Sequence, residues 1–289
     1  MSRTRAAAVL IGFILMNLTV VPAVWIALRL RLKAHVPLLY LYHRSLCWLM
    51  GVRVTVTGEP IKGGLMLANH MGWLDIPVLS ITCALSFIAK SEVNSWPMFG
   101  FLSRLQRTIF VRRSERGKAR EDSEQIRRRL LAGERLVIFA EGTSSDGNRI
   151  LPFKSALLSA AELPLGEDGA HHVVHTQVQP VTIAYVALFG MPMGRENRPF
   201  FAWYGDMDLV PHIVGAFGAG PVDVSVEFHK PLTVDEAGGR KKLALLAERT
   251  VRAGLVRALQ GRETPAAAAD VPLHNVGADE GEDEAEEAA

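Results

Sequence analysis

The sequence predicts an α/β fold, in which helices flank a mixed central sheet and an N-terminal membrane-associated helical segment precedes it. Three observations support this prediction. From residue 52 onward, short apolar stretches alternate with longer amphipathic ones, as in a domain built around a sheet. Residues 6–28 carry no charge, and residues 263–289 are acidic and Ala-rich. We therefore expect membrane-anchoring helices in 1–51, a globular domain in 52–262 and a disordered tail in 263–289.

The N-terminal run of 23 residues, 6–28, is long enough for a helix to cross a bilayer. It also exceeds the apolar region of a cleaved signal peptide, usually about 7–15 residues. Basic residues flank both ends, so their distribution does not orient the segment. Pro22 could break it into a hairpin that stays in one leaflet. Residues 36–52, with Tyr40, Tyr42 and Trp48, are interpreted as a second membrane-contacting helix, and a core helix is the alternative.

The apolar periodicity from residue 52 to 260 distinguishes strands from helices. Val52, Val54 and Val56 alternate with polar residues, which is typical of a half-buried strand. Strands are expected at 52–56, 65–68, 85–89, 108–111, 135–140, 178–186 and 222–228, and helices at 74–83, 118–131 and 235–259. In such folds, functional loops leave the carboxyl ends of the strands.

The formal net charge of +2 conceals a strong asymmetry. Residues 263–289 hold nine acidic residues and no Lys or Arg, which leaves 32 basic and 21 acidic residues in 1–262. A basic domain suits an anionic partner, such as lipid headgroups, a phosphorylated substrate, an acidic carrier protein or nucleic acid. The basic stretch 112–129 also contains four acidic residues, which favours a solvated face or a membrane contact over nucleic acid.

The first candidate site follows the strand expected at 65–68. His70 and Asp75 are five residues apart, so one continuous helix would place them about 140° apart. They can meet if His70 lies in the loop after the strand and Asp75 in the first turn of the next helix. Asp75 would then accept a hydrogen bond from one imidazole nitrogen and leave the other as a base. The alternative is a helix-capping Asp beside an unrelated histidine.

The second candidate site follows the strand expected at 135–140. Glu141, Gly142 and Thr143 come directly after apolar residues, and Gly142 permits a tight turn. Successive backbone N–H groups, together with the Thr143 hydroxyl, could hold an anion or a polar headgroup. An ordinary turn is the alternative.

Other chemistries lack their sequence signatures. No Gly-x-Ser-x-Gly elbow and no Walker loop occurs, and neither Cys47 nor Cys83 has a neighbouring histidine motif. Two cysteines also cannot form a disulfide framework. His171, His172 and His175 fall in an expected surface loop, so no metal site is predicted.

Four ordered blocks of the sequence resemble the glycerolipid acyltransferase family, which includes the bacterial lysophosphatidic acid acyltransferases. The blocks are Asn69-His70 with Asp75, Phe110-Val111-Arg112-Arg113, Phe139-Ala140-Glu141-Gly142-Thr143, and Val178-Gln179-Pro180-Val181. The resemblance covers roughly residues 52–260, and four blocks in the right order are far more specific than any one of them.

The resemblance implies transfer of a fatty acyl group from acyl carrier protein or coenzyme A to the free hydroxyl of a lysolipid, without an acyl-enzyme intermediate or a cofactor. It makes His70 the general base and Asp75 the group that orients it. It associates Pro180 with the acyl donor or the catalytic core. The residues that it associates with the acceptor headgroup are Arg113, Glu141, Gly142 and Thr143. It also implies an enzyme of the inner (cytoplasmic) membrane whose catalytic domain, 52–262, faces the cytoplasm.

The sequence departs from the family pattern where the acceptor is expected to bind. The second block usually has Gly and an acid where Arg107 and Arg112 stand, and the third has Pro and Arg where Ala140 and Ser144 stand. Without that Arg a bidentate phosphate clamp is weakened, although Arg112 or Arg149 could compensate.

The acceptor therefore has two candidates. The first expectation is 1-acylglycerol-3-phosphate, which would give phosphatidic acid. The alternative is lyso-ornithine lipid, a phosphate-free acceptor, and one enzyme could use both. The segments that resemble the lyso-ornithine lipid branch are 144–148, 204–207 and 211–212. A membrane lipid-binding scaffold is the non-enzyme alternative, and the missing nucleophile elbow disfavours a lipid hydrolase.

Overall fold

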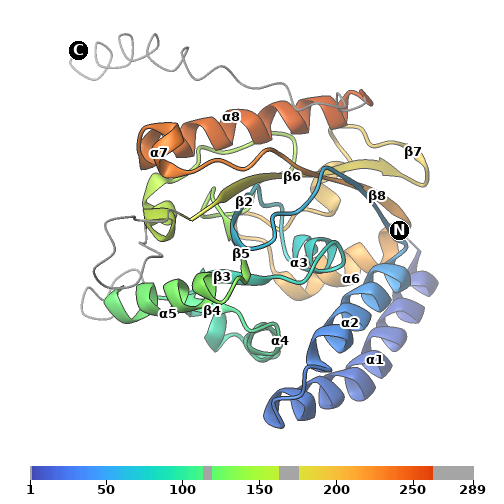
Figure 1. Ribbon diagram of the computed structural model, residues 1–289. Coiled ribbons are helices and arrows are strands. Elements are labelled where there is room, and N and C mark those ends of the chain that lie inside the picture. The colour runs from blue at the N-terminus through green and yellow to red at the C-terminus, as the bar shows by residue number, and fades with distance from the viewer. Residues whose placement is uncertain (1, 113–118, 163–175, 263–289) are drawn as a thin grey trace.

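The computed structural model describes residues 2–112, 119–162 and 176–262, and over these ranges the predicted α/β fold is confirmed (Figure 1). Arg113, the three histidines at 171, 172 and 175, and the acidic tail 263–289 lie outside the described residues. The strands are β1 (Val52–Thr57), β2 (Gly64–Ala68), β3 (Ser86–Lys90), β4 (Ile109–Val111), β5 (Arg135–Phe139), β6 (Val178–Leu188), β7 (Met191–Pro192) and β8 (Val222–Phe228). The α-helices are α1 (Arg3–Arg29), α2 (His35–Met50), α3 (Asp75–Ser80), α4 (Phe99–Leu105), α5 (Ala119–Leu131), α6 (Leu209–Ala219), α7 (Val234–Ala237) and α8 (Arg240–Leu259).

The sheet is mixed and mostly parallel. Its strands run in the order β1-β8-β6-β2-β5-β3-β4, and β7 pairs with β6. From β6 to β4 the neighbours are parallel, whereas β8 is antiparallel to β6 and parallel to β1. Ala68 at the end of β2 is in register with Phe139 at the end of β5. Because parallel strands leave a sheet at the same edge, the loops after β2 and β5 emerge side by side.

Helices cover both faces of the sheet, as Figure 1 shows. Met66 and Val137 contribute to the core shared with α1, α2, α3 and α6, while Leu65 and Leu136 contribute to the core shared with α5 and α8. Successive strand residues point to opposite faces, so an entirely apolar strand such as β2 is typical of a sheet buried on both sides.

The N-terminal helices α1 and α2 form an antiparallel pair that projects from one corner of the molecule (Figure 1). By length and composition α1 could cross a membrane, and 17% of its most apolar window is buried. Its first turn is fixed to the rest of the chain. Ser2 N–H donates to the Gly218 carbonyl at 3.1 Å, and the Arg5 guanidinium donates to the carbonyls of Phe217 and Met50.

Two expectations differ from the structure, and two helices were not expected. Pro22 does not break the first helix, which continues to Arg29. The chain turns at residues 30–34, where Arg31 adopts a positive φ of 54°. The single helix expected at 235–259 is divided into α7 and α8, because Gly238 and Gly239 adopt φ values of 74° and 117° that end the first helix. Helices α4 and α6 were not expected.

Candidate active site

The loop between β2 and α3 brings His70 and Asp75 together. The strand ends at Ala68 and the helix begins at Asp75, as the spacing predicted. His70 Nδ1 lies 2.9 Å from Asp75 Oδ2. The first residue of the loop, Asn69, is bound by β6, since its amide donates to the Ile183 carbonyl at 2.9 Å and accepts from Ile183 N–H at 2.8 Å. This pair of bonds fixes where His70 leaves the sheet.

The carboxylate of Asp75 is completely buried and accepts hydrogen bonds on both oxygens. Oδ2 accepts from the backbone N–H groups of Met71 at 2.6 Å and Gly72 at 3.1 Å, in addition to His70. Oδ1 accepts from the Tyr185 hydroxyl of β6 at 3.0 Å. The three other neighbours are donors, which favours an ionised carboxylate, so we assign the proton between the two side chains to His70 Nδ1. Nε2 of His70 is left with a free lone pair, as a general base requires.

The His70 ring is held from one side by an aromatic stack. It lies parallel to the Phe139 ring, with a centroid distance of 3.8 Å and an interplanar angle of 16°, and Phe139 in turn stacks on Phe87. The His70 side chain is 21% exposed. Its ring is therefore fixed in orientation by Asp75 and Phe139 and still open to a ligand.

Glu141, at the exit of β5, supports the backbone of the histidine loop. Its Oε1 accepts from His70 N–H and its Oε2 accepts from Leu151 N–H, both at 2.9 Å. The side chain is buried, and burial raises the pKa of Glu141 to about 7. Ser145 N–H donates to the His70 carbonyl at 2.8 Å. Residues of the second candidate site thus hold the backbone of the histidine loop in place, a role that the sequence did not predict.

A segment around Trp203 covers the histidine loop. Trp203 N–H donates to the Met71 carbonyl at 2.8 Å, and the Ser144 hydroxyl donates to the Trp203 carbonyl. At Gly72 a Cβ would lie 2.9 Å from the Trp203 backbone nitrogen, so this close approach requires glycine. The sequence gives no sign of this contact, because Trp203 is far from the motif blocks along the chain.

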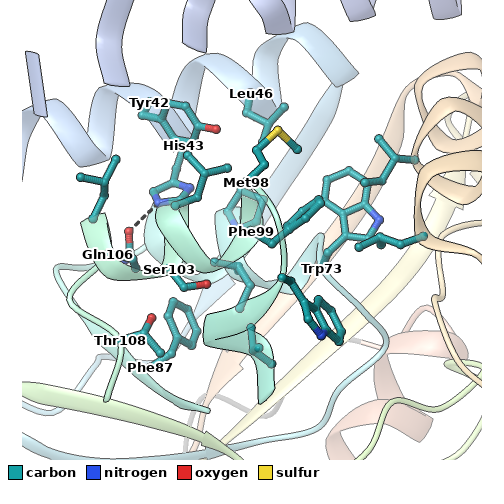
Figure 2. A pocket seen from close by; sticks show the side chains of 18 of the residues that line it. Tyr42, His43, Leu46, Trp73, Phe87, Met98, Phe99, Ser103, Gln106 and Thr108 are labelled. Carbon is teal, nitrogen blue, oxygen red and sulfur yellow. Dashed lines mark hydrogen bonds between the residues drawn. The ribbon is translucent and has the colours of Figure 1, made fainter. Parts of the chain in front are cut away.

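An apolar cavity of about 470 Å³ opens beside His70. Its walls come from α1, α2, α3, α4, α6 and the ends of β3 and β5, and they include Phe13, Leu46, Trp73, Leu102 and Phe217. Figure 2 shows the side chains of Tyr42, His43 and Leu46, which come from α2, together with those of Phe87, Met98 and Phe99, which also line the cavity. Of the described residues that line the cavity, only His70 is paired with a carboxylate. The cavity suits a long apolar ligand with its reactive end at His70.

Comparison with known proteins defines the family. A family model described as Acyltransferase matches residues 53–184. A lyso-ornithine lipid O-acyltransferase of Brucella abortus is 44% identical over 265 residues, which cover 91% of this chain and 98% of the relative. The chain belongs to the acyltransferase family.

Two further comparisons agree with that assignment. A lyso-ornithine lipid O-acyltransferase of Rhizobium meliloti is 41% identical to this acyltransferase, over 88% of the chain and 87% of the relative. The crystal structure of the 1-acyl-sn-glycerophosphate acyltransferase PlsC from Thermotoga maritima superposes with a TM-score of 0.55 and 20% identity, over 81% of this chain and 83% of that one. The likeness to the PlsC structure shows a shared fold.

The remaining predicted site residues of the acyltransferase do not all gather at His70. Gly142 forms the turn after β5 with φ 69°, and Thr143 beside it is exposed. Arg112 pairs with Asp122 at 3.0 Å and with Glu121 at 3.4 Å. Pro180 is a buried residue of β6 in register with Leu67, and it does not line the cavity. No cluster of metal-ligating side chains occurs among the described residues.

Proposed function

We propose that this acyltransferase esterifies the free hydroxyl of lyso-ornithine lipid with a fatty acyl group from an acyl thioester. The observation that carries the proposal is the His70–Asp75 pair at the wall of the apolar cavity. The cavity accounts for a fatty chain, and the pair accounts for activation of an alcohol. The choice of acceptor is supported by the names of the relatives that match nearly the whole chain.

The proposed reaction is a direct acyl transfer. His70 Nε2 removes the proton of the acceptor hydroxyl as its oxygen attacks the thioester carbonyl, and the C–O bond forms as the C–S bond breaks. Asp75 stabilises the imidazolium that results. The imidazolium then gives the proton to the leaving thiolate, which departs as free coenzyme A or acyl carrier protein. No protein nucleophile is needed.

The proposed acceptor, lyso-ornithine lipid, differs from 1-acylglycerol-3-phosphate, which was the first expectation from the sequence. Ser144 stands where the family pattern has Arg, and its hydroxyl donates to the Trp203 carbonyl. Arg112, which could have replaced that Arg, is engaged by Asp122 and Glu121. Since a phosphate clamp needs guanidinium donors directed at the ligand, these contacts support an acceptor without phosphate.

The exposed surface of α1 and α2 supports a membrane location. Ile11 is 60% exposed, Leu18 68% and Trp48 79%. Such large apolar side chains on adjacent helices are typical of a surface that inserts into the interfacial region of a bilayer. We propose that the helix pair lies in one leaflet of the cytoplasmic membrane, with the acyltransferase domain on the cytoplasmic side. The cavity, which both helices line, would then open close to the lipid substrates.

The test gives the purified chain both acceptors, lyso-ornithine lipid and 1-acylglycerol-3-phosphate, with both acyl carrier protein and coenzyme A thioesters. Products are identified by mass spectrometry. We expect ornithine lipid to form faster than phosphatidic acid, and His70→Ala to abolish both. Faster formation of phosphatidic acid would overturn the acceptor proposal. Lipid binding without product would indicate a scaffold, and free fatty acid without an acceptor would indicate a hydrolase.

A further inference from the structure

A buried polar pair lies in the wall of the otherwise apolar cavity. His43 of α2 and Gln106, which follows α4, both line it, and His43 Nε2 is 2.7 Å from Gln106 Oε1 (Figure 2). Gln106 Nε2 donates to the Ser80 hydroxyl and to the Leu85 carbonyl, both at 3.2 Å. The amide of Gln106 is therefore oriented, with its nitrogen turned to two acceptors and its oxygen turned to His43.

This orientation fixes the tautomer of His43. Because Gln106 Oε1 is an acceptor, His43 Nε2 must carry the proton, and Nδ1 is left with a lone pair. The residue is 6% exposed, and burial lowers the pKa of His43 to about 4, so the ring stays neutral at physiological pH. Within the described part of the chain, Nδ1 has no hydrogen-bond partner.

An unpaired buried acceptor is costly, and a ligand with a donor can satisfy it. Burying a polar group without a partner destabilises the folded protein. Ser103 and Thr108, which carry hydroxyl groups, also line the cavity (Figure 2). A saturated hydrocarbon chain offers none of these groups a partner. A hydroxyl can donate to His43 Nδ1 and can accept from a second hydroxyl.

We propose that the cavity selects a hydroxylated acyl chain, whose hydroxyl donates a hydrogen bond to His43 Nδ1. The proposal rests on the function proposed above, in which the cavity holds a fatty chain. His43 belongs to α2 and His70 to the loop after β2, so the recognised hydroxyl is distinct from the reacting one. The chain belongs either to the acyl donor or to the lysolipid acceptor, and both sources have the same chemistry.

The experiment compares matched chains in two arms. The first arm varies the donor thioester, with and without one hydroxyl at successive chain positions, on a fixed acceptor. The second arm varies the acyl chain of the acceptor in the same way, on a fixed donor. The measured quantity is the ratio of kcat/KM for the hydroxylated and the plain chain. We expect a ratio of roughly 5–30 in one arm, at one chain position or two adjacent positions, as a single buried hydrogen bond provides.

Two variants test the role of His43. His43→Phe removes the acceptor and keeps a planar ring, and we expect its ratio to fall to about one. His35→Phe makes the same substitution on the same helix at a half-buried position outside this cavity, and its ratio should match that of the unchanged protein. If His43→Phe does not fold, the double variant His43→Phe, Gln106→Leu removes both partners of the buried bond, and the same loss is expected.

A second readout does not depend on turnover. In the unchanged protein, hydroxylated free fatty acids should raise the melting temperature more than plain fatty acids do. In His43→Phe, the two kinds of fatty acid should raise it by the same amount. A ratio near one in both arms, or a preference that persists in His43→Phe, would overturn the proposal. If chains without a hydroxyl are still transferred, the proposed acyltransferase function stands and only the selection of a hydroxyl fails. If no chain of either kind is transferred, the proposed function itself is overturned.

Discussion

Replacing Asp75 by Asn tests whether the carboxylate supplies charge as well as orientation. The amide oxygen can take the place of Oδ2 and still accept from His70 Nδ1, Met71 N–H and Gly72 N–H. The amide nitrogen would then face the Tyr185 hydroxyl, which can rotate to accept. Asp75→Asn should therefore fold with His70 in the same tautomer, and the lost quantity is the negative charge.

The size of the effect follows from the geometry. The carboxylate has no exposed surface and lies 2.9 Å from the imidazole. Unit charges about 4 Å apart attract by about 4 kcal/mol at an effective dielectric constant of 20. Losing most of this attraction to the imidazolium should lower kcat by roughly 10²–10³. Tyr185→Phe, which removes one neutral donor to the same carboxylate, should cost about 1 kcal/mol and lower kcat about fivefold.

The assay measures initial rates of acyl transfer at saturating lysolipid and thioester, with the melting temperature of each variant as the control for folding. A folded Asp75→Asn variant whose kcat stays within about threefold of the unchanged protein would refute the reasoning. So would a Tyr185→Phe variant that is as impaired as Asp75→Asn, because the hydroxyl would then be more than a support for the carboxylate.

Three further outcomes are expected. Burial raises the pKa of Glu141 to about 7, from a value near 4.5 in the unfolded chain. The stability that the protonated side chain contributes is therefore present below pH 4.5 and is lost as the pH rises through 7. Calorimetry should show that Glu141→Gln removes about 3 kcal/mol of this pH dependence. Gly72→Ala should destabilise the protein by about 1–3 kcal/mol in denaturant titrations, because its Cβ would meet the Trp203 backbone. Leu46→Trp, in the cavity wall, should lower kcat/KM for long acyl donors about tenfold relative to short ones in competition assays.

The sequence predicted the two strand exits because local features define them. An apolar strand followed by Asn-His, or by Glu-Gly-Thr, indicates where a buried element ends, and the five-residue spacing of His70 and Asp75 then required a loop followed by a helix turn. Parallel pairing of β2 and β5 brought the exits together. The backbone role of Glu141 was not predicted, because the contact with His70 spans 71 residues of sequence.

The cavity was not predictable from the sequence, since each wall has an ordinary apolar pattern of its own. Helix α6 was missed because it is apolar on most sides and so lacks a clear amphipathic pattern. Tyr185 was one apolar residue in a long strand until the fold placed it against Asp75. Such contacts depend on which strands become neighbours, and periodicity within one segment carries no information about that order.

In the proposed reaction, the hydrogen bonds around Asp75 also determine where the proton travels. All four partners of the carboxylate are donors, so protonating it would break a bond and leave a buried N–H or O–H group unpaired, at a cost of about 1–3 kcal/mol. In the proposed mechanism, the proton taken from the acceptor hydroxyl therefore stays on His70 until it passes to the departing sulfur. Because the ring faces an apolar cavity, the imidazolium of the proposed mechanism would have a buried negative partner on one side and a developing oxyanion on the other. The proposed acyl transfer would thus leave no lasting unpaired charge in the apolar cavity.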